Sequence, residues 1–270
     1  MTHATTAPRR RGARSRIAAR FNWQGTVALL GLAAVWEVLL DTRIVQFEFL
    51  PAPSEILSAG FTILVSGALI TDTVHTLTST LVGWVIGSAI GIVVGLWFGL
   101  SAIARRFALA TAEIFRAAPG IAFVPVIILL FGFTITTEIV TIIYVSVWPV
   151  LVNAVAGAQA VTPVHSDAAK TLHLSQRESI IKITLPTSLP YIATGMKLSL
   201  TTALALAVVV EMIGNPAGLG YSIIFHEQSL QPAVMLAVVI WVGLIGLALN
   251  VLFERLSLMF SAIRANRSGA

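Results

Sequence analysis

The chain of 270 residues is 57% hydrophobic and only 11% charged, with a net charge of +5 and a mean hydropathy of +0.90. Soluble domains carry about 25% charged residues, so this composition excludes an ordinary soluble protein and favours a membrane protein. The absence of cysteine excludes disulfides and thiolate metal sites. The positive charge could reflect nucleic-acid binding, but in a membrane protein it more often marks the cytoplasmic side.

Six arginines precede the first apolar stretch, within residues 1–23. A signal peptide would have a shorter basic region and a small-residue cleavage site, and no such site follows residues 24–41. We therefore predict a disordered, basic cytoplasmic tail over residues 1–22, followed by an uncleaved first span. Binding of nucleic acid by this tail is the alternative, and a topology anchor is the interpretation that we favour.

Apolar stretches of about 20 residues are long enough to cross a bilayer as helices, and the chain has room for six of them. The sequence thus predicts an all-α integral membrane protein with about six transmembrane helices. The predicted spans are 24–41, 74–100, a segment within 107–132, 138–161, 188–212 and 232–254.

The distribution of basic residues gives the orientation of these spans. With the N-terminus inside, the four inner segments hold six, two, three and three Lys and Arg, which are fourteen of the chain's seventeen. This bias predicts that both termini are cytoplasmic. The predicted transmembrane domain is 23–260, with a cytoplasmic loop at 162–187 and a cytoplasmic tail at 261–270.

Within the second span, glycine recurs at every fourth residue and forms a stripe along one helix face. Small residues at this spacing let two helix backbones approach closely in lipid. Packing within one subunit is the favoured interpretation, and a contact in a dimer or gate is the alternative. The stripe consists of Gly83, Gly87, Gly91, Gly95 and Gly99.

The third span contains Pro119 and Pro125, which predict a broken or kinked helix because proline removes a backbone hydrogen bond. Glu113 and Arg116 are three residues apart and can pair on one helix face. Charges at membrane depth suggest a translocation pathway. Their nearness to two inner arginines equally favours side chains that reach the inner surface.

A polar segment, residues 166–186, interrupts the otherwise apolar chain. Ser166 can cap one short helix, and Ser175 begins an S-x-x-E capping box that opens a second helix. Pro186 and Pro190 are predicted to stop this second helix and restart the chain into the fifth span. The result is a cytoplasmic helix–turn–helix, which either docks a partner or rests on the lipid surface.

This segment, DAAKTLHLSQRESIIKITLP, resembles the EAA loop of ABC importer permeases. Three further stretches resemble the nitrate/sulfonate/taurine branch of that family, and the likeness extends over about residues 24–258. They are LPAPSEIL (50–57), VVVEMIGNPAGLGYSI (208–223) and LFERL (252–256).

Two residues of the loop depart from the family pattern. Asp167 stands where Glu is usual, and His173 stands where Gly is usual. Glycine serves where a turn needs a positive φ, a region that His tolerates at a cost. Either the turn or the matching partner surface therefore differs in this protein.

The resemblance implies the type I ABC importer permease fold in the plasma membrane, without enzymatic activity and without a cofactor. It also implies a separate cytoplasmic ABC ATPase subunit, an extracytoplasmic substrate-binding protein and a permease homodimer in the lipid bilayer. No G-x-x-x-x-G-K-[ST] phosphate loop occurs in the chain, which agrees with this division of labour. The residues implied in docking the ATPase are Asp167, Ala168, Ala169, Lys170, Leu172, His173, Leu174, Ser175 and Pro186.

The implied substrate is a small organic or inorganic anion of the sulfonate, nitrate or taurine type. Aromatic acids and thiamine or riboflavin precursors are alternative substrates. A stand-alone secondary transporter or channel is the competing function, although the spans show few ionisable residues for ion coupling. A membrane-bound enzyme would need a cluster of His, Asp or Glu, and none is evident in the sequence.

Several residues remain as candidates for the pathway. Lys197 can pair with another residue, extend toward the membrane surface or bind an anion. Glu211 can contact the binding protein or the substrate, or mark the water interface, which is the interpretation that we favour. Gly218 and Gly220 predict an outer turn. His75, His165 and His226 lack metal-like spacing, so we predict no metal site and interpret them as interface residues. The candidate pathway residues are Arg116, Pro119, Pro125, Lys197 and Glu211.

Overall fold

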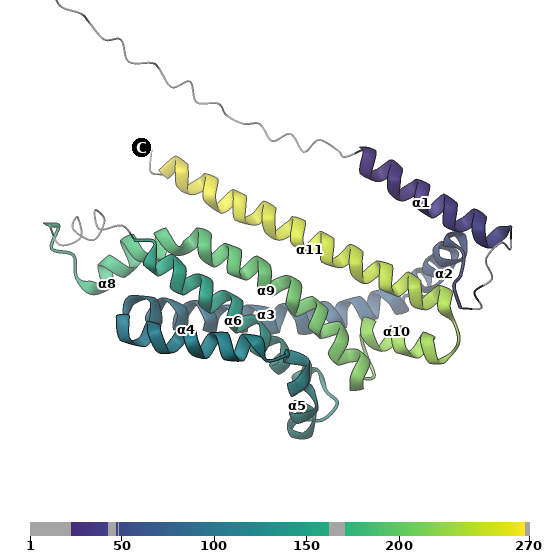
Figure 1. Cartoon of the computed structure of the whole chain (residues 1–270), viewed down its shortest axis with the longest axis horizontal. Coiled ribbons are helices and arrows are strands. Elements are labelled where there is room, and N and C mark those ends of the chain that lie inside the picture. Colours follow the sequence, from purple (N-terminus) through teal and green to yellow (C-terminus); the bar gives the residue numbers. More distant parts are fainter. Residues whose placement is uncertain (1–22, 43–46, 48, 162–170, 268–270) are drawn as a thin grey trace, which may run out of the picture. The chain divides into compact units, whose positions relative to one another are not determined.

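The computed structural model describes residues 23–42, 47, 49–161 and 171–267, and every regular element in these ranges is a helix (Figure 1). The chain divides into two units, Met1–Phe47 and Glu48–Ala270. In the first unit, α1 (Trp23–Asp41) is a single apolar helix. The helices of the second unit are α2 (Pro53–Val65), α3 (Ala68–Leu100), α4 (Ala102–Ala117), η1 (Gly120–Phe123), α5 (Val124–Phe131), α6 (Ile135–Gln159), α8 (Gln176–Ser179), η2 (Ile180–Thr184), α9 (Leu185–Gly214), α10 (Leu219–Gln228) and α11 (Pro232–Arg267).

Five of the described helices are long and apolar enough to cross a membrane, which confirms an all-helical, multi-pass architecture. They lie at Trp23–Asp41, Ala68–Leu100, Ile135–Gln159, Gln176–Gly214 and Pro232–Met259. The predicted third span is not among them. The chain forms two separate shorter helices there, which confirms the predicted break at Pro119 and Pro125 but gives no single long helix.

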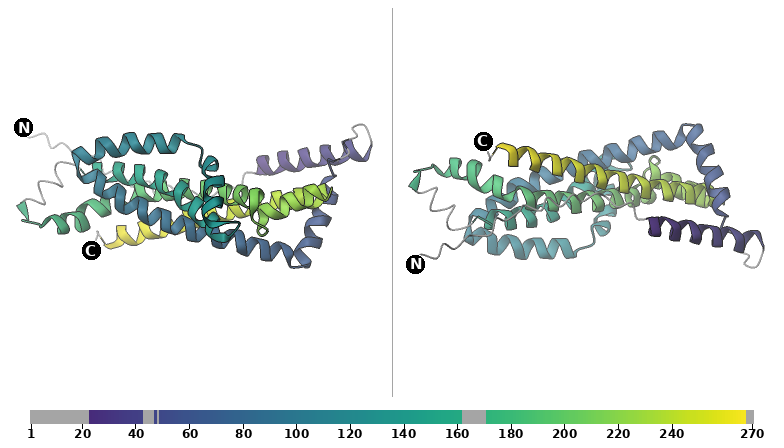
Figure 2. Two further views of the ribbon diagram at one scale, coloured as in Figure 1. Left: turned by 90° about the horizontal axis from the view of Figure 1, so that it is seen from below. Right: turned by 90° about the horizontal axis from the view of Figure 1, so that it is seen from above.

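The break in this region follows from its prolines. Helix α4 begins at a serine cap, where the Ala104 amide donates to Ser101 Oγ at 3.3 Å, and ends at Ala117. Pro119 precedes the 3-10 turn η1, and Pro125 occupies the first turn of α5, where its missing N–H is tolerated. Helix α4 turns back along α3 and α6, as both views in Figure 2 show.

Helix α6 lies between α3 and α9 and packs against both (Figure 1). All five stripe glycines of α3 face α6 of the same chain. A Cβ built on Gly87, Gly91 or Gly95 would lie 2.8, 2.8 or 2.6 Å from a backbone carbonyl oxygen of α6. Only hydrogen in place of a side chain allows the two helices to come this close.

Helix α9 also contacts α3, α10 and α11. Trp84 Nε1 of α3 donates to Ser199 Oγ of α9 at 2.9 Å. Near the start of α3 and the end of α9, an apolar cluster joins α3, α9, α10 and α11, which fixes α10 beside the end of α9. Its buried members are Leu69, Val208, Leu219, Ile223 and Val238.

The prediction that Pro186 and Pro190 stop a helix was wrong, because α8, η2 and α9 follow one another without a break. The segment η2 is π-helical, so the Leu185 amide donates to the Ile180 carbonyl, five residues back. The hydroxyl of Thr187 donates to a backbone carbonyl one turn earlier, at 2.8 Å. Such π turns and hydroxyl bonds let a membrane helix accommodate proline.

The glycine contact yields a test by single substitution. Gly91→Ala should lower the free energy of unfolding by about 1–3 kcal/mol, because its new Cβ overlaps α6. Gly243→Ala in α11 is the matched control, since a Cβ there meets nothing within 4 Å in this chain. Thermal unfolding of both purified variants in detergent measures the difference. Equal melting temperatures would contradict the close contact between α3 and α6.

Candidate functional site

The predicted coupling loop is described from Thr171 onward. The proposed docking residues Asp167, Ala168, Ala169 and Lys170 lie outside the described residues, as does Ser166. Within the described part, Leu172 is 68% exposed, and His173 and Ser175 are also exposed. The apolar side chain of Leu172 therefore stands free on the surface of this chain.

The turn at His173 has the backbone geometry that the sequence suggested. His173 has a φ of +49°, one of two positive values among the described non-glycine residues. Of the two alternatives left open by the sequence, an altered turn is therefore not the one found at this position. The turn is thus retained, and His173 carries the steric cost that glycine would avoid.

The second helix of the loop starts where the sequence placed it, and its capping box is confirmed. The Glu178 amide donates to Ser175 Oγ at 3.3 Å, and the Ser175 amide donates to Glu178 Oε2 at 3.1 Å. Lys182 Nζ lies 2.9 Å from Glu178 Oε1, one helical turn further on. These bonds fix the start of α8 directly after the turn at His173.

The helix that begins in the loop is in close contact with the transmembrane core. Thr184 and Ser188 are buried, and Ser188 Oγ donates to the Thr184 carbonyl at 2.8 Å. A Cβ on Gly157 of α6 would lie 2.9 Å from Ser188 Cα. The backbones of α6 and α9 are therefore in contact just beyond the loop. A displacement of the loop would act directly on a helix that is packed against the core.

A second group of polar residues is buried at the opposite end of α9. Glu138 is 0% exposed and Glu211 is 1% exposed. His75 Nε2 lies 3.0 Å from Glu138 Oε1, and Asn215 Nδ2 donates to the same oxygen. We call His75, Glu138, Glu211 and Asn215 the carboxylate cluster.

Glu211 also orders the chain that leads into α10. The Gly220 amide donates to Glu211 Oε2 at 2.8 Å, and Thr76 Oγ1 donates to the same oxygen at 3.0 Å. Gly218 has a φ of +94°, and a Cβ there would lie 2.4 Å from the Glu211 carboxyl carbon. The predicted turn is thus present at Gly218, whereas Gly220 lies inside α10, so its assignment to the turn was wrong.

Two interpretations based on the sequence need correction here. Glu211 was expected at the water interface, but its side chain is buried among α3, α9 and α10. His75 was expected to be an isolated interface residue, but it contacts Glu138 and Asn215. The partners come from helices that are far apart in sequence, so residue spacing could not reveal them.

The remaining candidate residues lie apart from this cluster. Lys197 Nζ pairs with Glu254 Oε2 of α11 at 2.9 Å. Pro119 and Pro125 are exposed at the break between α4 and α5. The side chain of Arg116 lies outside the described residues, so the predicted pair with Glu113 does too.

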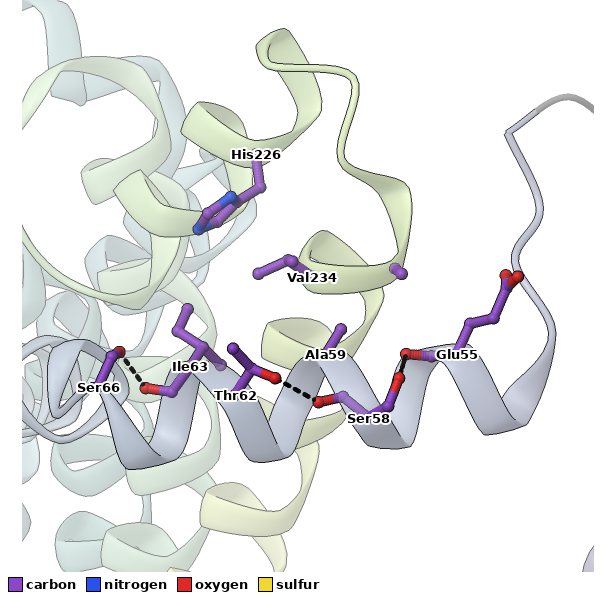
Figure 3. A pocket seen from close by; sticks show the side chains of 9 residues that line it. Glu55, Ser58, Ala59, Thr62, Ile63, Ser66, His226 and Val234 are labelled. Atoms are coloured by element: carbon purple, nitrogen blue, oxygen red, sulfur yellow. Dashed lines mark hydrogen bonds between the residues drawn. The ribbon is translucent and has the colours of Figure 1, made fainter.

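A pocket of about 490 Å³ lies between α2, α10 and α11 (Figure 3). The hydroxyls of Ser58, Thr62 and Ser66 line it, but each donates to a carbonyl of α2 itself, at 2.8–2.9 Å. His226 Nδ1 is engaged by Gln231 Oε1 at 2.8 Å. These polar groups are thus engaged in hydrogen bonds within the chain. They do not converge on the pocket as the polar groups of a substrate site would.

Comparison with known proteins decides the family. Residues 87–262 match the family model described as binding-protein-dependent transport system inner membrane component. The chain belongs to this family. It is therefore a multi-pass inner membrane component of a transport system, which agrees with its five apolar helices.

The named relatives belong to the nitrate/sulfonate/taurine branch that the sequence resembled, which confirms this resemblance. A putative aliphatic sulfonates transport permease of Bacillus subtilis is 28% identical, over 84% of this chain and 83% of the relative. A taurine transport system permease of Escherichia coli is 28% identical over the same shares. A nitrate import permease of Leptolyngbya laminosa is 29% identical over 52% of this chain and 50% of the relative.

Solved structures show the same fold. Inward-facing structures of the methionine ABC transporter include one that matches with a TM-score of 0.58 at 20% identity, over 70% of this chain and 94% of the solved chain. An amino acid ABC transporter matches with a TM-score of 0.57 at 21% identity, over 74% and 95%. The chain is thus an ABC importer permease subunit, a transport component rather than an enzyme.

The strained turn at His173 gives a test of the loop. His173→Gly should stabilise the turn by about 1 kcal/mol, because a non-glycine residue with positive φ costs about 1–2 kcal/mol. His173→Val should destabilise it, since β-branched residues adopt this region least readily. Hydrogen–deuterium exchange of residues 171–179 should be slower in the Gly variant and faster in the Val variant. The reverse order would contradict the turn geometry.

Proposed function

We propose that this permease subunit forms one half of the translocation pathway of an ATP-driven importer and is moved by a cytoplasmic ABC ATPase through residues 166–186. A second copy of the chain supplies the other half, and an extracytoplasmic binding protein delivers the substrate. The observation that carries this proposal is the family match together with the unbroken helix from the loop into the core.

The mechanical path supports the role of the loop. The exposed turn at Leu172 and His173 leads through the capping box into α8, η2 and α9 without an intervening flexible segment. Buried Ser188 then touches α6 through Gly157. If the ATPase pulls on the loop, α9 and α6 would move together because they are packed against each other. Such rigid-body movement suits a switch between two arrangements of the helices.

A polar strip between α9 and α11 supports a pathway between two copies. Lys197 pairs with Glu254, and Thr201 Oγ1 lies 3.4 Å from Asn250 Oδ1. The side chains of Lys197 and Glu254 are 43% and 60% exposed, although both helices are largely apolar. Charged groups facing lipid cost about 2.5–3.5 kcal/mol each at the centre of the bilayer. We therefore expect this polar strip to face water or a second copy of the chain rather than lipid.

The proposed substrate is a small anion of the sulfonate, nitrate or taurine type. Support comes from the named relatives, which are 28–29% identical. The positive charge of Lys197 is balanced by Glu254 and is not left over to select an anion. Selection among these anions is accordingly assigned to the binding protein rather than to this subunit.

Ala168 gives the direct test of coupling. Ala168→Glu should abolish ATP-driven uptake by the reconstituted importer while the complex still hydrolyses ATP. The reason is that a bulky, charged side chain would enter the proposed close contact between the loop and the ATPase. Ala168→Ser is the matched control and should keep most of the uptake, since it preserves a small side chain.

The transport readout uses taurine, an alkanesulfonate and nitrate, each supplied with the binding protein. Unchanged uptake in the Ala168→Glu variant would contradict the assignment of the loop. If the unmodified importer takes up none of the three anions, the proposed substrate class is contradicted. The coupling test would then be repeated with another substrate.

The polar strip can be tested by labelling, because the chain has no cysteine of its own. Thr201→Cys should react with a charged, water-soluble thiol reagent, since thiolate chemistry requires a wet environment. Val93→Cys on α3, 69% exposed in this chain, is the lipid-facing control and should react at least tenfold more slowly. Equal rates at both positions would contradict a water-exposed strip.

A further inference from the structure

The carboxylate cluster poses a problem that the transport function does not explain. Two glutamates, Glu138 of α6 and Glu211 of α9, are almost completely buried in the same small region. Within the described residues, the only ion pair of either carboxylate is with His75, and no Lys or Arg pairs with them. Burying ionised carboxylates is costly unless something positive neutralises them.

Hydrogen bonds leave the cluster incomplete. Glu138 Oε2 and Glu211 Oε1 are both buried, and neither has a hydrogen-bond partner among the described residues. The other oxygen of each carboxylate is fully used, by His75 and Asn215 for Glu138 and by Thr76 and Gly220 for Glu211. A buried acceptor without a donor costs about 1–3 kcal/mol, and more when it is charged. Two buried oxygens without a donor, on neighbouring carboxylates, are the arrangement that a bound positive group would satisfy.

The geometry matches that of a cation site. One ligand atom from each of His75, Glu138 and Glu211 lies within 4.8 Å of the other two. A tetrahedral ion with bonds of about 2.1 Å holds its ligand atoms about 3.4 Å apart. The ligand atoms would therefore have to draw together by at most about 1.4 Å to bind one ion.

We propose that His75, Glu138 and Glu211 bind a divalent transition-metal ion, Zn²⁺ or Mn²⁺. Carboxylate oxygens suit Mn²⁺ and other hard ions, imidazole suits Zn²⁺, and both ions accept a mixed set of one nitrogen and two oxygens. The dication balances two carboxylates and gives the bare oxygens a partner. The side chain of His75 is 23% exposed, so the cluster can be reached from the surface of this chain at that residue.

Such an ion would act as a structural joint. Its ligands come from α3, α6 and α9, and Glu211 also orders the start of α10 through the Gly220 amide. The ion would therefore fasten together the ends of three packed helices and the turn before α10. This role goes beyond the proposed transport function, and its test needs neither the ATPase nor the substrate.

The test measures metal binding and thermal stability of the purified full-length chain in detergent. After treatment with a chelator, the protein is titrated with Zn²⁺ or Mn²⁺ alone, and bound metal is counted by mass spectrometry. We expect one equivalent per chain and a melting temperature raised by about 5–10 °C at an ion concentration one hundred times the Kd.

Variants separate the site from general surface binding. Glu138→Gln removes one charged ligand and should fold without metal, because it relieves a buried charge, but it should bind the ion at least a hundredfold more weakly. Glu227→Gln replaces an exposed carboxylate of α10 and should behave like the unmodified chain. If the unmodified chain binds neither ion, or if Glu138→Gln binds it equally well, the proposal is overturned and protons neutralise the cluster instead.

Discussion

Close contact between α3 and α6 is the constraint on which the rest of the second unit depends. In lipid, helices gain little from burying apolar side chains, so they associate through tight packing and polar contacts. The glycines of α3 supply that packing, because their missing Cβ atoms let α6 backbone oxygens approach. Helix α9 packs against the same pair, with Gly157 of α6 against Ser188 at one end and the carboxylate cluster at the other.

Helix α9 therefore links two distant features of the permease. Its 30 residues span about 45 Å at 1.5 Å per residue, from the π turn beside the loop to Gly214, three residues beyond Glu211. At one end it continues from the turn at His173, and at the other it orders the start of α10. Under the proposed function, this helix carries a displacement of the cytoplasmic loop toward the opposite side of the transmembrane core.

Local features of the loop and the glycine stripe were predictable because they depend on residues close in sequence. The capping box at Ser175 and the one-face spacing of the glycines each follow from side-chain chemistry within a few residues. The positive φ at His173 was suggested by the family resemblance, since that position is usually glycine. The uninterrupted helix through Pro186 was not predictable, since a π turn and hydroxyl bonds offset the missing amides. The carboxylate cluster was missed because His75 and Glu138 are 63 residues apart, and only the packing of α3 against α6 brings them together.

Retention of an ATPase subunit tests the central claim most directly. The chain would be expressed with an ATPase and a binding protein encoded beside it, purified on its own tag in mild detergent, and compared with a variant in which residues 166–174 are replaced by a Gly/Ser linker. The account predicts that the ATPase copurifies with the unmodified chain and is lost from the variant, while both chains remain monodisperse. An ATPase retained equally by the variant would contradict coupling through the loop, and an ATPase retained by neither would contradict the proposed importer.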